Sequence, residues 1–261
     1  MHPFLLLQSR PEQAVADHEY QAFLDHGQLS EGQLVRVPMH EIQPDINLDD
    51  YAGVIMGGGP ANFSTPDSQK PATQKAFEPW LFELLGRIIS QDKPFLGTCL
   101  GLGALITYTG GSMQLAGGEQ AGPVQASLTV DGMNDPLLRG LPQEFSVIVG
   151  HKEGALDAPE ALTVLARSAT CIQMVRAGHN VYATQFHPEL TPEGLRYRLE
   201  AYKDAGYCDP NEINSLVTAA ADANAIHAVN ILRAFTTRYA SDVSDLHKRQ
   251  LSATPLGATL N

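Results

Sequence analysis

The sequence predicts an α/β fold, with a mostly parallel central sheet flanked by helices and an antiparallel or mixed extension. Two patterns carry this prediction. Near the amino terminus, residues 4–7, 34–37 and 53–56 are short, almost wholly apolar segments separated by longer stretches. Such segments are typical of buried parallel strands joined by crossover helices. After Gly111, short apolar segments follow one another between turn residues, which indicates antiparallel or mixed strands.

The remaining elements follow from the same patterns in chain order. A helix is expected from the turn at residues 9–11 to about Asp25, and residues 75–90 have the spacing of an amphipathic helix. Residues 194 to about 239 are expected to be helical, in two pieces broken near residues 206–210. Later strands are expected at residues 124–130, 145–149, 162–167, 171–176 and 181–185. We therefore expect one domain over residues 1–240 and a polar tail over residues 241–261.

Composition narrows the class of protein. The chain has 261 residues, 43% of them hydrophobic, and a net charge of −12, which argues against nucleic acid as a partner. The apolar run that begins at Pro3 lacks a basic flank and is too short for a signal peptide or a membrane span. Three widely spaced cysteines form no metal-ligand pattern. These features predict a soluble, cytoplasmic protein with reduced thiols, no membrane contact, no metal and no cofactor.

The segment from Gly97 to Gly101 has the form Gly-x-Cys-x-Gly, between the end of an apolar strand and an apolar helix that reaches Tyr108. This pattern is typical of a nucleophile elbow, in which a tight strand-to-helix turn presents a reactive side chain. The turn requires glycine on both sides, because a Cβ there would strike the neighbouring strand or helix. Cys99 would lie at the positive end of the helix, where the thiolate is favoured over the thiol.

A thiol nucleophile needs a base and a group that orients the base. Gln185-Phe186-His187-Pro188-Glu189 directly follows an apolar strand far downstream of the elbow. In an extended segment, alternate residues point the same way, so His187 and Glu189 are expected to project to one side of the strand end. The carboxylate would then hold the imidazole in the tautomer that accepts a proton. The candidate triad is Cys99, His187 and Glu189.

Together these motifs resemble those of the class I glutamine amidotransferases, and of the amidotransferase domains of GMP synthases in particular. The resemblance extends over roughly residues 54–199, and weaker matches occur in the family's order at Gly57-Gly58-Gly59-Pro60, Gly110-Gly111, Glu119, Gly122 and His151-Lys152-Glu153. It implies a flavodoxin-like architecture and release of ammonia from glutamine through a cysteine thioester. It further implies an oxyanion hole from backbone N–H groups of Gly58, Gly59 and Leu100.

By the same resemblance, the backbone around His151 and Lys152 would hold the amino-acid end of the substrate. One position departs from the family, which usually has glutamine four residues after the nucleophile, where this chain has Gly103. Loss of a polar contact there relaxes selectivity, so the substrate is expected to be glutamine or another γ-glutamyl compound. The chain carries no pyrophosphatase loop or P-loop, so either a separate synthetase subunit receives the ammonia or the protein is a free-standing hydrolase.

Three alternatives stay open at this point. The chain could be a free-standing hydrolase of γ-glutamyl amides or peptides that needs no partner. It could also be a catalytically silent amidotransferase-like domain that binds a partner or a metabolite. Related cysteine-elbow proteins of the stress-response and peptidase-like type are the least favoured, because they usually place histidine directly after the nucleophile, where this chain has Leu100.

Overall fold

The computed structural model describes residues 2–240 and contains one nine-stranded sheet, in the order β2-β1-β3-β4-β9-β8-β7-β5-β6. The predicted tail at residues 241–261 lies outside the described residues. The strands are β1 Phe4–Gln8, β2 Leu34–Pro38, β3 Gly53–Met56, β4 Phe95–Thr98, β5 Glu119–Leu128, β6 Glu144–His151, β7 Thr163–Arg167, β8 Ile172–Ala177 and β9 Val181–Thr184.

The sheet has a parallel half and an antiparallel half. Neighbouring strands from β2 through β1, β3 and β4 to β9 pair in parallel. The remaining pairs, from β9 through β8, β7 and β5 to β6, are antiparallel. Strands β1, β3, β4 and β9 are buried along their whole length, as expected for strands covered on both faces. The predicted α/β fold with a mixed extension is confirmed.

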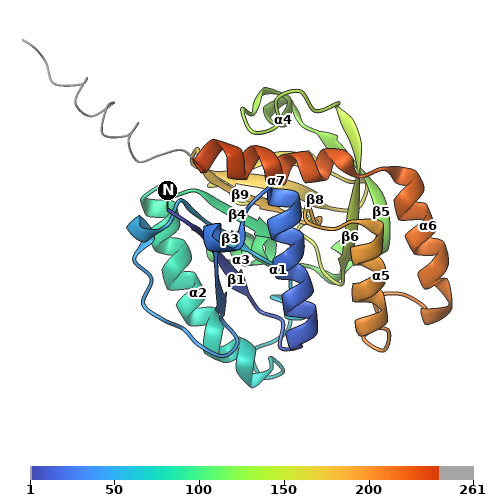
Figure 1. Cartoon of the computed structure of the whole chain (residues 1–261), viewed down its shortest axis with the longest axis horizontal. Coiled ribbons are helices and arrows are strands. Elements are labelled where there is room, and N and C mark those ends of the chain that lie inside the picture. The colour runs from blue at the N-terminus through green and yellow to red at the C-terminus, as the bar shows by residue number, and fades with distance from the viewer. Residues whose placement is uncertain (1, 241–261) are drawn as a thin grey trace, which may run out of the picture.

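Helices cover both faces of the parallel half (Figure 1). Buried side chains of α1 and α7 pack with Phe4 and Leu6 on one face, whereas α2 and α3 pack with Leu5 and Leu7 on the other. A third cluster joins α5 and α6 to β5 and β6. The helices are α1 Gln13–Gly27, α2 Ala72–Ser90, α3 Leu100–Tyr108, α4 Val130–Asn134, α5 Pro192–Ala201, α6 Ile213–Ala223 and α7 Ile226–Tyr239.

The structure differs from the sequence prediction mainly in its second half. The carboxy-terminal helical region has three helices rather than two, because Asn224 adopts a left-handed conformation with φ of 50° and ends α6. Strand β5 begins at Glu119, and its register shifts between Glu119 and Gly122. Val130, which we expected in a strand, begins α4, where the Thr129 side chain caps the helix by accepting from Gly132 N.

The position of β9 in the sheet brings the segment that follows β9 close to the segment that follows β4. Although they are far apart in sequence, β4 and β9 are neighbours, and Thr98 pairs with Thr184 at their carboxyl ends. A backbone hydrogen bond of 2.7 Å from Cys99 N to Thr184 O continues this pairing beyond the strands. Strand β3 lies on the other side of β4. The segments that follow β3, β4 and β9 therefore meet at one edge of the sheet, which is where ligands bind in open α/β folds.

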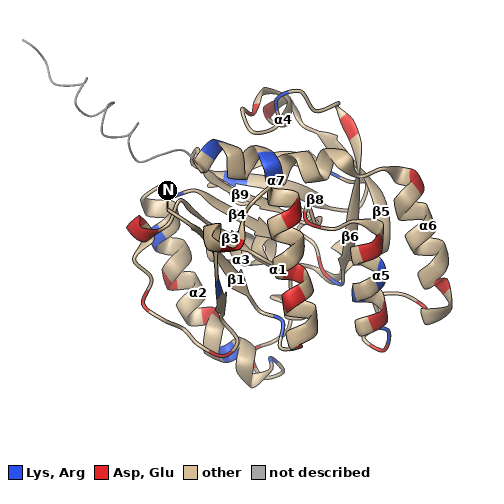
Figure 2. Ribbon diagram, in the orientation of Figure 1, with Lys and Arg blue, Asp and Glu red and all other residues tan. Residues whose placement is uncertain are grey.

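Charged side chains are spread over the helices, the loops and the strand ends. Figure 2 shows several acidic residues on α1 and both acidic and basic residues on α5. This distribution agrees with the net charge of −12. Within residues 2–240, every helix is too short or too polar to cross a membrane.

Candidate active site

Cys99 occupies the tight turn between β4 and α3 that the sequence predicts. Its backbone has φ of 51° and ψ of −91°, a conformation that L-residues rarely adopt and that is found mainly at functional sites. A Cβ on Gly97 would lie 2.9 Å from the backbone of Gly101, so only glycine fits at Gly97. The strand and helix therefore fix the direction of the Cys99 side chain, which is half-buried.

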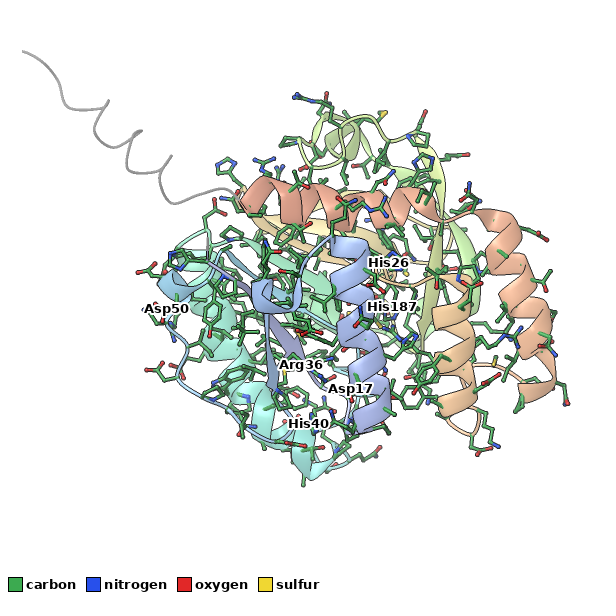
Figure 3. All side chains as sticks on the ribbon, in the orientation of Figure 1. Asp17, His26, Arg36, His40, Asp50 and His187 are labelled. Carbon is green, nitrogen blue, oxygen red and sulfur yellow. The ribbon has the colours of Figure 1, made fainter. Side chains whose placement is uncertain are left out.

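His187 and Glu189 form a buried pair after β9. The Nδ1 of His187 donates a hydrogen bond of 2.8 Å to Oε1 of Glu189, which leaves the Nε2 of the neutral ring as a proton acceptor. Arg198 on α5 donates through Nη2 to the same Oε1 at 2.9 Å. Figure 3 shows His187 in the region between α1 and α5.

The structure brings Cys99 and His187 to the same place. A Cβ built on Gly58, in the segment after β3, would lie 2.6 Å from Cε1 of His187 and 3.4 Å from Cβ of Cys99. The two side chains therefore flank the small space that Gly58 leaves free. Both also line one cavity. The predicted triad residues are thus assembled at the edge formed by β3, β4 and β9.

The electrostatic surroundings keep both reacting groups neutral. Burial raises the pKa of the Cys99 thiol to about 12, and the positive charge of Arg10 only partly offsets this effect. Burial also lowers the pKa of His187 below the ordinary 6.5, against the opposing influence of Glu189. The sequence-based expectation of a thiolate at the helix end is therefore not met, because loss of solvent outweighs the favourable charges. The arrangement suits transfer of the thiol proton to the imidazole during attack, rather than a preformed thiolate.

Glu189 stays ionised in this setting. Burial by itself would raise the pKa of Glu189, but His187 and Arg198 hold that pKa far below its ordinary value. Its carboxylate can therefore orient the His187 ring and stabilise the imidazolium that forms when the ring accepts a proton.

Gly59, in the segment after β3, lines the same two cavities as Cys99. Ser9 Oγ donates to the carbonyl oxygen of Gly58 at 3.1 Å, which fixes the peptide plane between Gly58 and Gly59. In a trans peptide, the N–H of Gly59 points away from that carbonyl. A Cβ on Gly59 would lie 1.8 Å from Ser9 Oγ, so the close approach requires glycine. Leu100 begins α3, and its N–H has no acceptor within the helix.

Two cavities meet at Cys99. The first, here called the α5 cavity, comprises about 440 Å³ of space, part of it open to solvent, and is lined by His187, Arg10 and residues of α5. The second, here called the β6 cavity, comprises about 290 Å³, part of it open to solvent, and is lined by His151, Lys152 and other residues near the end of β6. Gly59, Cys99, Gly150 and Tyr207 contribute to both walls.

Glu153 ties the wall of the β6 cavity to the segment after β3. Its buried carboxylate accepts hydrogen bonds of 2.7 Å from Phe63 N and of 2.7 Å from Ser64 N. His151 is held on both sides, because Nδ1 lies 2.8 Å from Glu153 O and Nε2 lies 3.0 Å from Oε2 of Glu119. His151 and Lys152 both line the β6 cavity.

Gly103 is placed differently. It is buried inside α3, and a Cβ there would lie 2.9 Å from the Phe63 ring. Gly103 does not contribute to either cavity wall at Cys99. The phenyl ring fills the space into which a longer side chain at position 103 would project. Phe63 and Gly103 therefore form a matched apolar pair.

Glu119, His151 and Cys171 form a compact group of metal-type ligands, with their ligand atoms within 4.8 Å of one another. All three are engaged without a metal. Oε2 of Glu119 accepts from Gln173 Nε2 at 2.7 Å and lies 3.8 Å from the Cys171 sulfur. Through the pairing of Glu119 with His151, this group supports the end of β6.

Sequence reasoning missed the buried ion pairs behind His187. Arg10 donates to Glu19 at 3.0 Å, and Arg198 lies 3.6 Å from the same carboxylate. Arg198 Nη1 also lies 3.0 Å from Nδ1 of His187. These residues come from the segment after β1, from α1 and from α5, and only the folded chain places them together. The sequence contains one signal for these ion pairs. Glu19 lies on the otherwise apolar face of α1, and Arg198 lies on the otherwise apolar face of α5.

Comparison with known proteins agrees with this geometry. The family model for glutamine amidotransferase class-I matches residues 15–199. The chain belongs to the class I glutamine amidotransferases. Among curated relatives, it is 31% identical over 140 residues to a glutamine-hydrolysing GMP synthase of Bacillus velezensis, covering 53% of this chain and 24% of that protein. It is 26% identical over 154 residues to the Helicobacter pylori GMP synthase, covering 59% of this chain and 27% of that protein.

This amidotransferase chain therefore spans about a quarter of the length of the GMP synthases that it matches. Among solved structures, it resembles a glutamine amidotransferase of Thermotoga maritima, with a TM-score of 0.73, 21% identity, and coverage of 93% of this chain and 100% of that one. A second similar structure, a glutamine amidotransferase of Methylobacillus flagellatus, has a TM-score of 0.68, 20% identity, and coverage of 92% of this chain and 94% of that one. At these identities the structures establish the shared fold.

Proposed function

We propose that the chain hydrolyses the side-chain amide of glutamine through a thioester on Cys99. The observation that supports this proposal most is the meeting of Cys99 with the His187–Glu189 pair at the ends of β4 and β9. Class I relatives include proteins described as glutamine-hydrolysing. The same residue types in the same chain order support that chemistry here.

The reaction proceeds in two halves. The Cys99 sulfur attacks the amide carbon while Nε2 of His187 takes the thiol proton. Glu189 stabilises the imidazolium, which then donates its proton to the departing nitrogen and releases ammonia. Water, activated by the neutral imidazole, attacks the thioester and releases glutamate. Because both groups start neutral, charge separation occurs only during the attack.

The oxyanion that forms during each half-reaction requires hydrogen-bond donors beside the sulfur. We assign this role to the N–H groups of Gly59 and Leu100, with Gly58 supplying the space and the peptide orientation. Loss of one such donor typically costs about 2.7–4 kcal/mol in the activation free energy. We place the amino-acid end of the substrate in the β6 cavity, near the backbone of His151 and Lys152.

A variant series tests the proposal. Cys99→Ala removes the sulfur, so ammonia release from glutamine is expected to fall to the background rate, while circular dichroism and the unfolding midpoint stay close to those of the parent. Cys208→Ser is the matched control, since Cys208 is a second half-buried thiol that lines neither cavity at Cys99. A Cys99→Ala protein as active as the parent would overturn the proposal. A synthetase subunit that takes the ammonia, and a cytoplasmic location, stay predictions.

A further inference from the structure

We infer that the preferred substrates are γ-glutamyl amides whose nitrogen carries an uncharged, apolar group, and that the α5 cavity receives this group. The inference rests on the proposed function, because it assigns the leaving group of the same reaction. Three observations support the inference. His187 lines the α5 cavity, the wall of that cavity is mostly apolar, and the charged side chains in the wall are paired with one another.

The position of His187 decides where the leaving nitrogen lies. In amide hydrolysis, the imidazole that accepts the thiol proton also protonates the departing nitrogen. The nitrogen must therefore be on the His187 side of Cys99. His187 lines the α5 cavity and is not among the residues that line the β6 cavity. A substituent on that nitrogen consequently extends into the α5 cavity, whereas the amino-acid half of the substrate extends into the β6 cavity.

The wall of the α5 cavity is mostly apolar beyond His187. Helix α5 and the segments around it supply aliphatic side chains, and Tyr207 closes the side shared with the β6 cavity. The apolar and aromatic lining residues are Ala121, Val149, Leu190, Leu195, Leu199, Tyr202 and Tyr207. Ammonia is small and strongly polar, so a wall of this composition gives it no favourable contact. An alkyl or aryl group of a few carbon atoms would instead gain free energy by leaving water.

The charges in the same wall are already paired. The guanidinium of Arg10 contacts Glu19 at 3.0 Å, and that of Arg198 contacts Glu189 at 2.9 Å. Both carboxylates are fully buried, so each positive charge is balanced by a fixed negative charge. No carboxylate in this wall, as far as the structure describes it, is free to pair with a cationic substituent, and burying an unpaired ammonium is costly. The cavity therefore favours neutral amines over amines that carry a second positive charge.

The polar half of the substrate fits the other cavity. Its wall contains Asn62, Lys152 and Gln185, and Oε1 of Gln185 is buried without a hydrogen-bond partner among the described residues. A free acceptor of this kind suits an ammonium group, as in the amino-acid end of a γ-glutamyl compound. The two cavities thus divide the substrate at its amide bond into a zwitterionic part and an apolar part.

The reaction balances with water as the second substrate. A carbon–sulfur bond forms to Cys99 as the carbon–nitrogen bond breaks, and the nitrogen leaves as the free amine with the proton that His187 took from the thiol. Water then replaces sulfur at the carbon, and its proton returns to the sulfur through His187. The products are glutamate and the amine.

The test compares matched pairs of amides by the glutamate that they release. γ-Glutamylbenzylamide is expected to have a kcat/KM about tenfold or more above that of γ-glutamylmethylamide, since a filled apolar pocket gives discrimination of this size. γ-Glutamylpentylamide is expected to exceed its cationic isostere, the 4-aminobutylamide, by a similar factor. A benzylamide turned over no faster than the methylamide, or a preference for the cationic amide, would overturn the inference.

Variants of α5 connect this preference to the cavity. Leu195→Trp should fill the space and lower the benzylamide to methylamide ratio about tenfold, whereas Leu195→Ala should raise the ratio of a naphthylmethylamide to the benzylamide. Glu200→Trp adds the same bulk on the exposed face of α5 and should leave the ratio unchanged. Ratios that stay unchanged in both Leu195 variants would contradict the assignment.

The two proposals fail in different ways. If glutamine is hydrolysed in a Cys99-dependent reaction while the benzylamide is inert, the α5 cavity does not hold a substituent and only this inference is overturned. If neither amide is hydrolysed, the proposed function fails and the inference fails with it.

Discussion

At the scale of single residues, the neutral state of His187 governs the pH dependence of the reaction. Only the neutral ring can accept the Cys99 proton, and burial lowers the pKa of His187 below 6.5. As the pH falls, the ring therefore stays neutral past the point at which an exposed histidine would be protonated. The pKa of the Cys99 thiol is raised to about 12, so ionisation of this thiol does not change the reaction rate near neutral pH.

We therefore predict that kcat/KM for ammonia release is constant from about pH 8 down past 6.5 and then falls with a single acidic limb. The limb reflects protonation of His187, so its midpoint should lie below the ordinary histidine value. The measurement is a pH profile at substrate concentrations well below KM. A midpoint above 6.5 would mean that the charge of Glu189 outweighs burial, and it would contradict the lowered pKa of His187.

The candidate triad could be predicted at this scale because each of its residues belongs to a local motif. The elbow requires glycine around Cys99, and alternation along an extended segment places His187 and Glu189 on one side. Arg198 belongs to no such motif. Its role depends on how α5 packs against the segment after β9, which no spacing in the sequence encodes.

At the scale of elements, Glu153 holds the segment after β3 against the end of β6. Each charge-assisted hydrogen bond to a backbone N–H is worth about 1.5–3 kcal/mol, and Glu153 makes two of them. Without them, the segment that contains Phe63 and Ser64 would lose its hydrogen bonds to the end of β6, and the neighbouring Gly59 in the cavity wall would be held less firmly. Small misplacements at a reacting centre reduce rates strongly.

We predict that Glu153→Ala lowers kcat/KM by about tenfold to a hundredfold, with Glu153→Gln intermediate because the amide retains one acceptor. Glu160→Ala, on an exposed residue nearby in the chain, is the control and should change little. The measurement is kcat/KM for glutamine in the parent and in all three variants. Equal activity in Glu153→Ala and the parent would show that the segment is positioned by other contacts.

The elements themselves were predictable where burial is complete. Strands β1, β3 and β4 are continuous apolar runs, and such runs have few alternatives to a parallel core strand. The boundaries of the helices after β9 were harder to predict. Asn224 ends α6 in a left-handed backbone conformation, which asparagine tolerates but does not require. The early start of β5 at Glu119 follows from its pairing with His151 on β6, a contact between distant segments.

At the scale of the whole molecule, the site depends on a sheet that places β9 beside β4. The order of the strands brings His187 to Cys99, although the two residues are far apart in the chain. Behind them, the ion pairs of Arg10 and Arg198 link α1, the segment after β1 and α5. Three separate parts of the fold therefore hold one imidazole, which explains why sequence motifs alone predict the triad but not its support.

The measurement that tests the central claim most directly is covalent labelling with an electrophilic glutamine analogue, followed by peptide mass mapping. Because the account makes Cys99 the thiol that His187 activates, one adduct per chain is expected, on the peptide that contains Cys99. The label should be absent from Cys99→Ala and present in Cys208→Ser. A label on Cys171 or Cys208, or an unlabelled Cys99 in a folded protein, would contradict the account.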